Sequence, residues 1–414
     1  MNYDIRKTDH RLTLDIKRVG QLSISVLVLY YMCYNEKYGH NALIVYGAFL
    51  VMCGSLAIEL IKDRELSFEN YYIGAWWNFV IVAYAFSTGI FVAHNIASLL
   101  EGIRLVLQYS IIVFAIYYFA NKSVNGIKWL LFTINLAALI CCYFLLTGPV
   151  EKIRGRYSIS FNNNPNTLGF MLVIGIFSIA YRFKADIKWI VLNIPQIILM
   201  IYGIVLTGSR KALISAVILV ILWVIETIGE IIKHKDIWEQ LVLIILFVVA
   251  LSVGVRFILS VYNQSEIALR MEHFLDDESN GNRINYYRLA WQILLNKPLF
   301  GGGLDQFKYW SGVGGYAHST YAEAIADFGT IGSLLYFFPI IDSGYRLFQR
   351  TANKKNYFQT RIVLALWIVE ILIGLGQIFF VDIMHYISWT IIYINVTDGM
   401  KITTNSNRYK YVRN

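Results

Sequence analysis

The chain has 414 residues, of which 57% are hydrophobic and only 15% are charged, whereas soluble domains carry about 45–50% apolar and about 25% charged residues. With a mean hydropathy of +0.53, this composition excludes an ordinary soluble domain. The net charge of +9 would suit a nucleic-acid partner, but the basic residues lie in short loops between apolar segments, where membrane topology explains them. We therefore expect an all-α polytopic membrane protein without a nucleic-acid partner.

The apolar segments are long enough to cross a bilayer as helices, because about 20 apolar residues span its hydrocarbon core and a helix satisfies its own backbone hydrogen bonds. The pattern predicts twelve spans within one polytopic membrane domain that covers 1–414. These spans lie near 19–35, 40–61, 71–93, 102–120, 127–147, 166–183, 188–206, 210–229, 238–260, 319–345, 361–380 and 383–398.

Lys and Arg are enriched in every second connection, as expected for cytoplasmic loops. Most of the 36 Lys and Arg residues fall on the side of the N-terminus, so we expect both termini in the cytoplasm and the chain in the cytoplasmic membrane. Two short outer loops carry positive charge against this bias. Lys152, Arg154 and Arg156 follow the fifth span, and Arg210 and Lys211 open the eighth. Such residues either bind an anion or extend to lipid head groups.

The connection over 260–318 is far longer than usual, and the topology places it outside the cell membrane. Its centre predicts a short amphipathic helix that starts near Arg283, is capped by Asn280 or Asn282, and ends before Pro298. Apolar residues recur at helical spacing in this segment, at Ile284, Tyr287, Trp291 and Leu294. Such a helix is expected to lie on the membrane surface.

The segment TGSRK opens the eighth predicted span. Thr207 or Ser209 can cap this helix, which places Arg210 in its first turn. Free backbone N–H groups, the helix dipole and a guanidinium then converge on a site suited to phosphate. Arg283 and Arg288 of the loop helix are candidates to reach the same site. The alternatives are a plain helix cap followed by an interfacial arginine, and two solvated arginines on an exposed helix.

His318 stands just before the tenth span, and Glu323 and Asp327 share one face of the outer half of that span. Carboxylates at membrane depth suggest function. A histidine accepts a proton near neutral pH, and a nearby carboxylate would orient it and raise its basicity. The alternative is an interfacial histidine with acids that serve helix packing. We interpret Asp382 and His385 as a polar turn. No metal or nucleotide motif is present, so we expect neither a metal nor another cofactor.

Four motifs, taken in their order and spacing, resemble those of the O-antigen ligase and Wzy polymerase superfamily of bacterial membrane glycosyltransferases. They are the Asn-rich stretch NNNPNTLGF at 162–170, the T-x-S-R helix start TGSRKALIS at 207–215, an arginine followed by P-L-x-G-x-G from Arg283 through Gly303, and H-[N/S]-x9-G-[L/T] from His318 to Thr330. Tyr287 stands where many members have tryptophan.

The resemblance implies a metal-independent, inverting glycosyl transfer at the outer face of the cytoplasmic membrane, from an undecaprenyl-diphosphate-linked oligosaccharide to an acceptor hydroxyl. His318 would be the general base, and Arg210 and Arg283 would bind the diphosphate and stabilise the leaving group. The further candidates for substrate binding are Arg288, Lys211, Arg154, Arg156, Glu323 and Asp327.

Within this superfamily we favour a polymerase of polysaccharide repeat units, because the chain is rich in Tyr, Ile and Asn, as divergent members are. The runner-up is an O-antigen ligase, whose acceptor is a lipid A core or a protein. A transporter or flippase of lipid-linked sugars is a less favoured alternative, since it predicts broken helices near the bilayer midplane and an internal repeat, which the sequence does not indicate. Beside the lipid bilayer, a chain-length regulator is a candidate partner.

Overall fold

The computed structural model describes most of the chain. The described residues are 15–33, 42–63, 73–123, 126–148, 150–153, 156–159, 164–183, 186–234, 236–263, 265–272, 278–352, 357–380 and 382–410. Arg154 lies outside these ranges, so its role in substrate binding stays a prediction.

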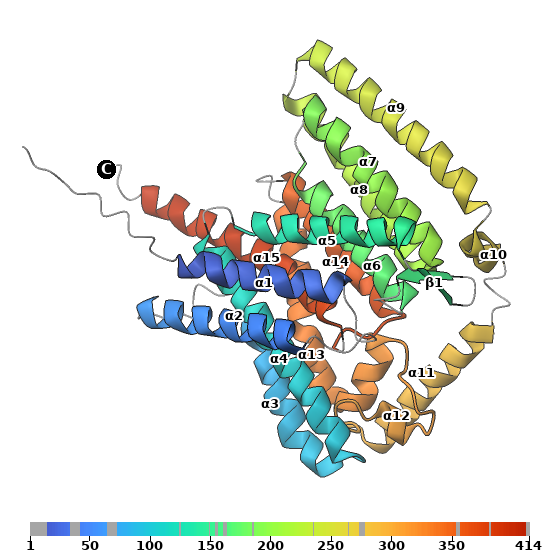
Figure 1. Cartoon of the computed structure of the whole chain (residues 1–414). Helices are drawn as coiled ribbons and strands as arrows, with labels where there is room; N and C mark the ends of the chain where they lie inside the picture. The colour runs from blue at the N-terminus through green and yellow to red at the C-terminus, as the bar shows by residue number, and fades with distance from the viewer. Residues whose placement is uncertain are drawn as a thin grey trace, which may run out of the picture.

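A helix overlaps most of each of the twelve predicted spans (Figure 1), although α14 ends at Gly374, before the predicted end at 380. These helices are α1 (Ile16–Cys33), α2 (Ala42–Asp63), α3 (Gly74–Val92), α4 (Ile96–Lys122), α5 (Lys128–Thr147), α6 (Pro165–Tyr181), α7 (Ile187–Thr207), α8 (Arg210–His234), α9 (Ile237–Tyr262), α13 (Thr320–Ala352), α14 (Tyr357–Gly374) and α15 (Ile383–Lys410). Within the described part of the chain, 8 helices are long and apolar enough to cross a membrane. The prediction of an all-α, multi-pass membrane protein is therefore confirmed, while the number of twelve crossings stays a prediction.

The ends of these helices follow from local sequence. Asn164 precedes α6, its side chain accepts a hydrogen bond from the backbone N–H of Asn166 at 3.0 Å, and Pro165 takes the first helical position, which suits a residue without an N–H group. Gly208 ends α7 in the left-handed conformation, with φ +62°. The turn from α7 into α8 is therefore only two residues long.

The apolar residues lie both inside the bundle and on its outside. In α6, which packs against α5, α7 and α8, every residue from Leu168 to Ala180 is buried. Helix α9 stands at one edge beside α7 and α8 (Figure 1) and exposes large side chains such as Val253 at 62% and Phe257 at 47%. Exposed apolar surface of this extent is unusual for a soluble protein and suits contact with lipid.

A short β-hairpin interrupts the helical pattern between α5 and α6. Strands β1 (Val150–Ile153) and β2 (Arg156–Ile159) pair in antiparallel register, with Lys152 opposite Tyr157. The sequence predicted no strand here. Two strands of four residues are too short for a periodic signal, and the hairpin is held by contacts of β2 with α5, α6 and α7.

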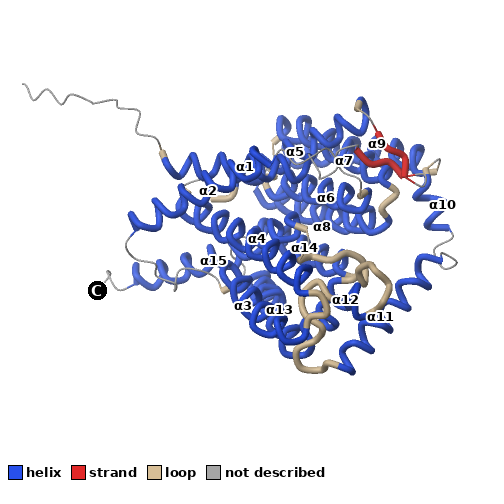
Figure 2. Tube along the Cα trace, turned by 60° about the horizontal axis from the view of Figure 1, so that its bottom comes forward, coloured by secondary structure: helices blue, strands red, loops and turns tan. Residues whose placement is uncertain are grey.

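The described part of the long connection between α9 and α13 contains three helices, namely α10 (Glu266–Glu272), α11 (Glu278–Asn296) and α12 (Phe307–Trp310). Figure 2 shows the loop around α12 lying between α11 and α13. The predicted helix near Arg283 is thus present, but it begins at Glu278, so the proposed caps Asn280 and Asn282 were wrong and lie inside it. Ile284 and Trp291 are 61% and 55% exposed, as an amphipathic surface helix requires.

The described connections that the topology places outside meet at one end of the bundle. Hydrogen bonds join Asn95 to Gln306, Arg156 to Thr207, and Tyr287 to Leu375. The loops after α3, α5, α7, α11 and α14 therefore form one continuous surface.

Candidate functional site

Asn166, in the first turn of α6, is the junction of two of these loops, the one after α5 and the turn after α7. Its side-chain oxygen accepts hydrogen bonds from an Nη of Arg156 at 2.7 Å and from the hydroxyl of Ser209 at 3.1 Å. The Nε of Arg156 also donates to the carbonyl of Thr207 at 2.9 Å. These contacts hold the turn from which α8 starts. They also connect the Asn-rich motif to the T-x-S-R motif.

The first two residues of α8 bring positive charge to this turn. Arg210 is buried, at 7% exposure, and Lys211 is half-buried, with its Nζ donating to the carbonyl of Gly376. The charges of Arg283 and Arg156 both act on Lys211. Cations from β2, α8 and α11 are therefore gathered at the positive end of a helix, where an anion is stabilised.

Helix α11 is fastened to this cluster along one side. Arg283 is half-buried, the ring of Tyr286 packs on that of His318 with 5.7 Å between centroids, and the hydroxyl of Tyr287 donates to the carbonyl of Leu375 at 2.8 Å. Arg288 is exposed and, at 3.6 residues per turn, lies about 140° around the helix from Arg283. The structure thus brings Arg283 to the cluster and leaves Arg288 on another side of α11.

His318 has an unusual backbone, with φ +56°. This conformation is uncommon for residues other than glycine, although Asn, Asp and His adopt it more often than the rest, and it is held here by neighbours on both sides. After it, Ser319 donates to the carbonyl of Gly374 at 3.3 Å, and the amide and hydroxyl of Thr320 both donate to the carbonyl of Gln377. The imidazole is thereby presented between α11 and the turn after α14.

The environment of His318 favours its neutral form. Loss of water around the ring, followed by the positive charges of Arg283 and Lys211, lowers the pKa of His318 below its usual value of 6.5. The expectation that a carboxylate raises its basicity was therefore wrong for the protein without substrate. The imidazole is mostly neutral at pH 7 and can accept a proton.

Glu323 acts on the backbone next to His318. It is fully buried, one of its oxygens accepts the N–H of Ala317 at 2.6 Å, and its other oxygen has no hydrogen-bond partner among the described residues. The carboxylate thus positions the peptide that precedes His318, and among the described residues it has no hydrogen bond to the imidazole ring. Its predicted role in substrate binding stays a prediction.

Asp327, one turn further along α13, holds the loop that follows the glycine run. It is 1% exposed. One oxygen accepts the N–H of Asp305 at 2.8 Å, and the other accepts those of Phe307 at 2.9 Å and Gln306 at 3.3 Å. Three backbone donors on one carboxylate indicate a positioning role at the start of α12.

Helix α13 is broken at Gly329, which has φ +63° and ψ −164°. The segment 298–303 docks on this break. The amide of Gly303 donates to the carbonyl of Asp327 at 2.8 Å, and that of Thr330 donates to the carbonyl of Pro298 at 2.8 Å. A Cβ on Gly301 would lie 2.4 Å from the amide nitrogen of Gly329. The P-L-x-G-x-G segment and the glycine that ends the His318–Thr330 motif are thus in direct backbone contact, and we call this contact the joint. The break in α13 was not expected from the sequence.

One buried histidine was misplaced by the sequence analysis. Asp382 does lie in a polar turn, where its carboxylate accepts from Gln377 and Met384. His385 instead pairs with Glu370, with 2.7 Å between Nδ1 and Oε2 and both side chains fully buried. Glu370 stood inside an apolar span, which by itself points to function, so the sequence contained the signal that was missed.

The arrangement as a whole can bind an anion and accept a proton side by side. Arg283 and Lys211 are close enough for their charges to act on each other and on the imidazole of His318. Asn166, Tyr286 and Gly376 were not predicted, since a side-chain amide, a tyrosine and a backbone carbonyl carry no specific motif. Among the described residues, no group of three or more His, Cys, Asp and Glu side chains is placed to hold a metal ion.

Comparison with known families gives this geometry its context. Residues 196–337 match the family model described as O-antigen ligase, a stretch that includes Arg210, Lys211, Arg283, His318 and Gly329. A comparison with curated proteins gave no match. The predicted resemblance is confirmed over this stretch of the chain, which is similar to the O-antigen ligase family.

Proposed function

We propose that the protein is a membrane glycosyltransferase that polymerises undecaprenyl-diphosphate-linked oligosaccharide repeat units at the outer face of the cytoplasmic membrane. The observation that carries the proposal is that the ring of His318 packs on Tyr286 of α11, and that the charges of Arg283 on the same helix and of Lys211 act on it. The family match over 196–337 supports transfer of a lipid-linked glycan.

In the proposed reaction, Arg210, Lys211 and Arg283 hold the diphosphate of the donor, with Arg156 behind them. The oxygen of the acceptor hydroxyl forms a bond to the anomeric carbon of the donor glycan, while the bond from that carbon to the diphosphate oxygen breaks. The proton of the hydroxyl passes to His318, and the electron pair leaves with the lipid diphosphate. Attack opposite the leaving group inverts the anomeric centre.

The same cations link donor binding to the strength of the base. In the protein without donor, Arg283 and Lys211 disfavour the imidazolium form of His318. A bound diphosphate offsets these charges, so the affinity of His318 for a proton increases when the donor is in place. The base is thus strongest in the complex that needs it, and the cations then stabilise the charge that develops on the leaving group.

The runner-up remains a ligase, which would use the same groups on a lipid A core or protein acceptor. The discriminating experiment compares cells that lack the protein and are complemented with wild type, His318→Ala, Arg283→Ala or Arg346→Ala. Lipid-linked and transferred glycans are separated and sized. Arg346→Ala is the matched control, because Arg346 pairs with Asp342 at 2.8 Å in the distal half of α13.

For a polymerase, we expect long glycans with wild type and Arg346→Ala, and only single repeat units with His318→Ala and Arg283→Ala. Long chains that accumulate on the lipid diphosphate and never leave it would identify a ligase. Normal glycans in the His318→Ala and Arg283→Ala cells, at normal protein abundance, would contradict both functions and favour a transporter.

A further inference from the structure

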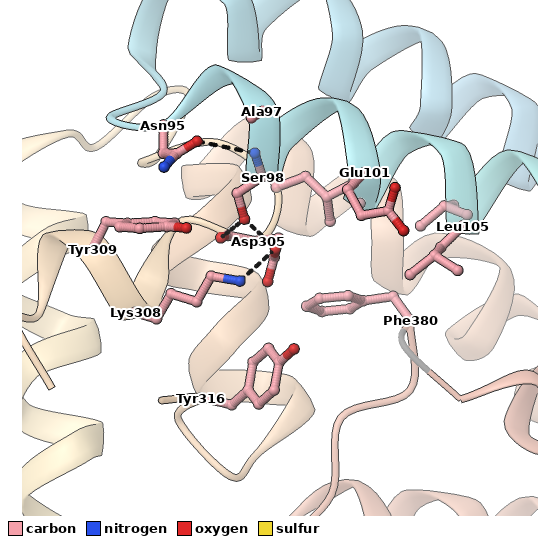
Figure 3. Close-up of a pocket in the computed structure, with 13 residues that line it drawn as sticks. Asn95, Ala97, Ser98, Glu101, Leu105, Asp305, Lys308, Tyr309, Tyr316 and Phe380 are labelled. Carbon is pink, nitrogen blue, oxygen red and sulfur yellow. Dashed lines mark hydrogen bonds and ion pairs between the residues drawn. The ribbon is translucent and has the colours of Figure 1, made fainter. Parts of the chain in front are cut away.

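A cavity of about 310 Å³ opens beside the proposed reaction site, between the first turns of α4 and the loop that contains α12 (Figure 3). Its volume lies at the lower end of the range of small-molecule sites, about 300–1,000 Å³. The residues that line it include Ser98, Glu101, Leu105, Asp305, Tyr316 and Phe380. We call this cavity the Asp305 pocket.

Asp305 stands at the centre of the pocket with one free oxygen. Its Oδ2 accepts hydrogen bonds from the hydroxyl of Ser98 and from Nζ of Lys308 at 2.7 Å. Its Oδ1 is buried and has no hydrogen-bond partner among the described residues. Leaving a buried carboxylate oxygen unpaired is costly, so a ligand that donates a hydrogen bond at this point would be stabilised.

The backbone of Asp305 is fixed from behind. Its φ is +61°, which Asp tolerates better than most residues, and its N–H donates to Asp327. A Cβ on Gly102 of α4 would lie 3.2 Å from the Cβ of Asp305. The free oxygen is therefore held in place by α4 and α13 before any ligand arrives, as a preformed site requires.

The charges around the pocket are matched, in contrast to the cationic cluster at Arg283. Lys308 is paired with Asp305, and Glu101 is paired with Arg104 on the exposed surface of α4. No cation without an acidic partner lines the pocket in the described part of the chain. An anionic ligand gains little here, so the favoured ligand is uncharged.

The remaining walls suit the ring of a sugar. Leu105 and Phe380 give apolar surface, and the ring of Tyr316 faces the cavity below Lys308 and Asp305 (Figure 3). Lys308 lies 5.7 Å from the centroid of Tyr316. A pyranose combines C–H groups that pack on aromatic and apolar side chains with hydroxyls that donate to a carboxylate, and the Asp305 pocket offers both kinds of partner.

We propose that the Asp305 pocket binds an uncharged sugar residue of the acceptor glycan. The inference rests on the proposed function, because Tyr316 in the pocket and His318 at the reaction site are two residues apart. Two residues span at most about 7 Å between their Cα atoms, so a sugar in the pocket lies near enough for it, or the next sugar of its chain, to reach the base. The pocket thus selects the acceptor, while the cationic cluster binds the donor.

Saturation-transfer NMR on the full-length protein in nanodiscs tests the proposal. The probes are methyl glycosides of neutral hexoses, N-acetylhexosamines and 6-deoxyhexoses, with glucuronic acid as the anionic comparison. Ala97→Trp narrows the pocket from an exposed position at its mouth, so it is expected to fold. Its matched control is Ala57→Trp, at an exposed position on α2 outside the pocket.

Asp305→Asn removes the charge but keeps the size and the tolerance for positive φ. It is compared with Asp342→Asn, which changes another Asp paired with a basic residue. We expect at least one neutral glycoside to bind the wild type. Its affinity should fall at least about tenfold in Ala97→Trp and Asp305→Asn, and be unchanged in both controls.

A signal that persists in Ala97→Trp, a stronger signal for glucuronic acid than for every neutral glycoside, or no binding of any neutral glycoside would overturn the proposal. The test is independent of catalysis, because Arg283→Ala should leave the sugar signal intact. Normal glycans in His318→Ala cells would refute the proposed function, whereas a pocket-independent sugar signal would refute only this inference.

Discussion

Asp327 carries the sharpest prediction about how the site is held together. In Asp327→Asn, one carboxylate oxygen becomes an NH₂ group at the same position. The wild-type oxygens accept the N–H groups of Asp305, Gln306 and Phe307, the first and last at 2.8 and 2.9 Å. Whichever way the amide is turned, at least one of these backbone donors faces another donor, and the carboxamide oxygen can retain at most two of them.

One buried donor without a partner costs about 1–3 kcal/mol. This cost increases the equilibrium constant for local opening of the segment 305–307 by about 5- to 150-fold. Hydrogen exchange read by mass spectrometry on the protein in nanodiscs measures this directly, and we expect faster exchange by that factor in peptides that contain the amides of 305–307. Because the neighbouring glycine segment docks on the same turn of α13, peptides over 299–303 should show a smaller increase.

The matched control is Asp186→Asn. Asp186 caps α7 by accepting the N–H of Lys188 at 2.9 Å, and Asn is about as good as Asp in this position. Exchange in α7 should therefore be unchanged. If exchange over 305–307 in Asp327→Asn is no faster than in wild type, the carboxylate does not hold the loop, and the positioning role given to Asp327 is wrong.

Three further predictions concern the joint, the base and the junction. Gly301→Ala should lower the free energy of unfolding by about 2–5 kcal/mol, since a positive φ costs about 1–2 kcal/mol and the clash at 2.4 Å with backbone adds about 1–3 kcal/mol. The control Gly312→Ala, with a similar φ of +69° and open space around its Cβ, should lose only the cost of the positive φ. Equal losses in the two variants would contradict the docking of segment 298–303 on the break in α13. In an NMR titration of the protein without donor, the midpoint for protonation of His318 should lie below pH 6.5, and Arg283→Gln should move it to higher pH because one repelling charge is gone. An unmoved midpoint would show that the charges of Arg283 and His318 do not interact. Asn166→Ala removes the acceptor of two hydrogen bonds and should cost about 1–3 kcal/mol in thermal unfolding; no measurable loss would show that the junction is not structural.

The helices were predictable because their cause is local. About 20 apolar residues in a row can satisfy their backbone only as a helix in lipid, and the observed bounds of α5 and α7 agree with the predicted spans within a residue or two. The hairpin after α5 and the early start of α11 were missed, since a four-residue strand and the first turn of a polar helix depend on contacts with distant elements rather than on a periodic pattern.

For the site, the sequence identified the charged residues but could not arrange them. The motif separated Arg283 from Arg288, but only the structure shows that Arg283 lies near His318 while Arg288 lies on another side of α11. The two acids of α13 were candidates for substrate binding, which stays a prediction, and the sequence did not show that Glu323 and Asp327 accept hydrogen bonds from loop amides. Which partner a buried carboxylate finds depends on loop geometry, and no spacing rule encodes it.

The break in α13 also depends on a contact with a distant loop, which sequence spacing does not encode. Gly329 followed by an ordinary apolar stretch gives no sign of a broken helix, because glycine is tolerated inside helices at a cost of about 1 kcal/mol. Only the approach of Gly301 to within 2.4 Å of a Cβ position at Gly329 requires the glycine and its φ of +63°. The two glycine motifs, more than 25 positions apart, are explained by each other.

The central claim is that the cationic cluster holds a lipid diphosphate while His318 removes the proton of an acceptor hydroxyl. The most direct measurement is single-turnover release of undecaprenyl diphosphate by the purified protein in nanodiscs, with a lipid-linked oligosaccharide present as both donor and acceptor. With wild type, we expect undecaprenyl diphosphate to be released together with a glycan lengthened by one unit. His318→Ala should give neither product, although that variant still binds the donor. Release at the wild-type rate by His318→Ala, or no lengthened glycan with wild type, would contradict the central claim.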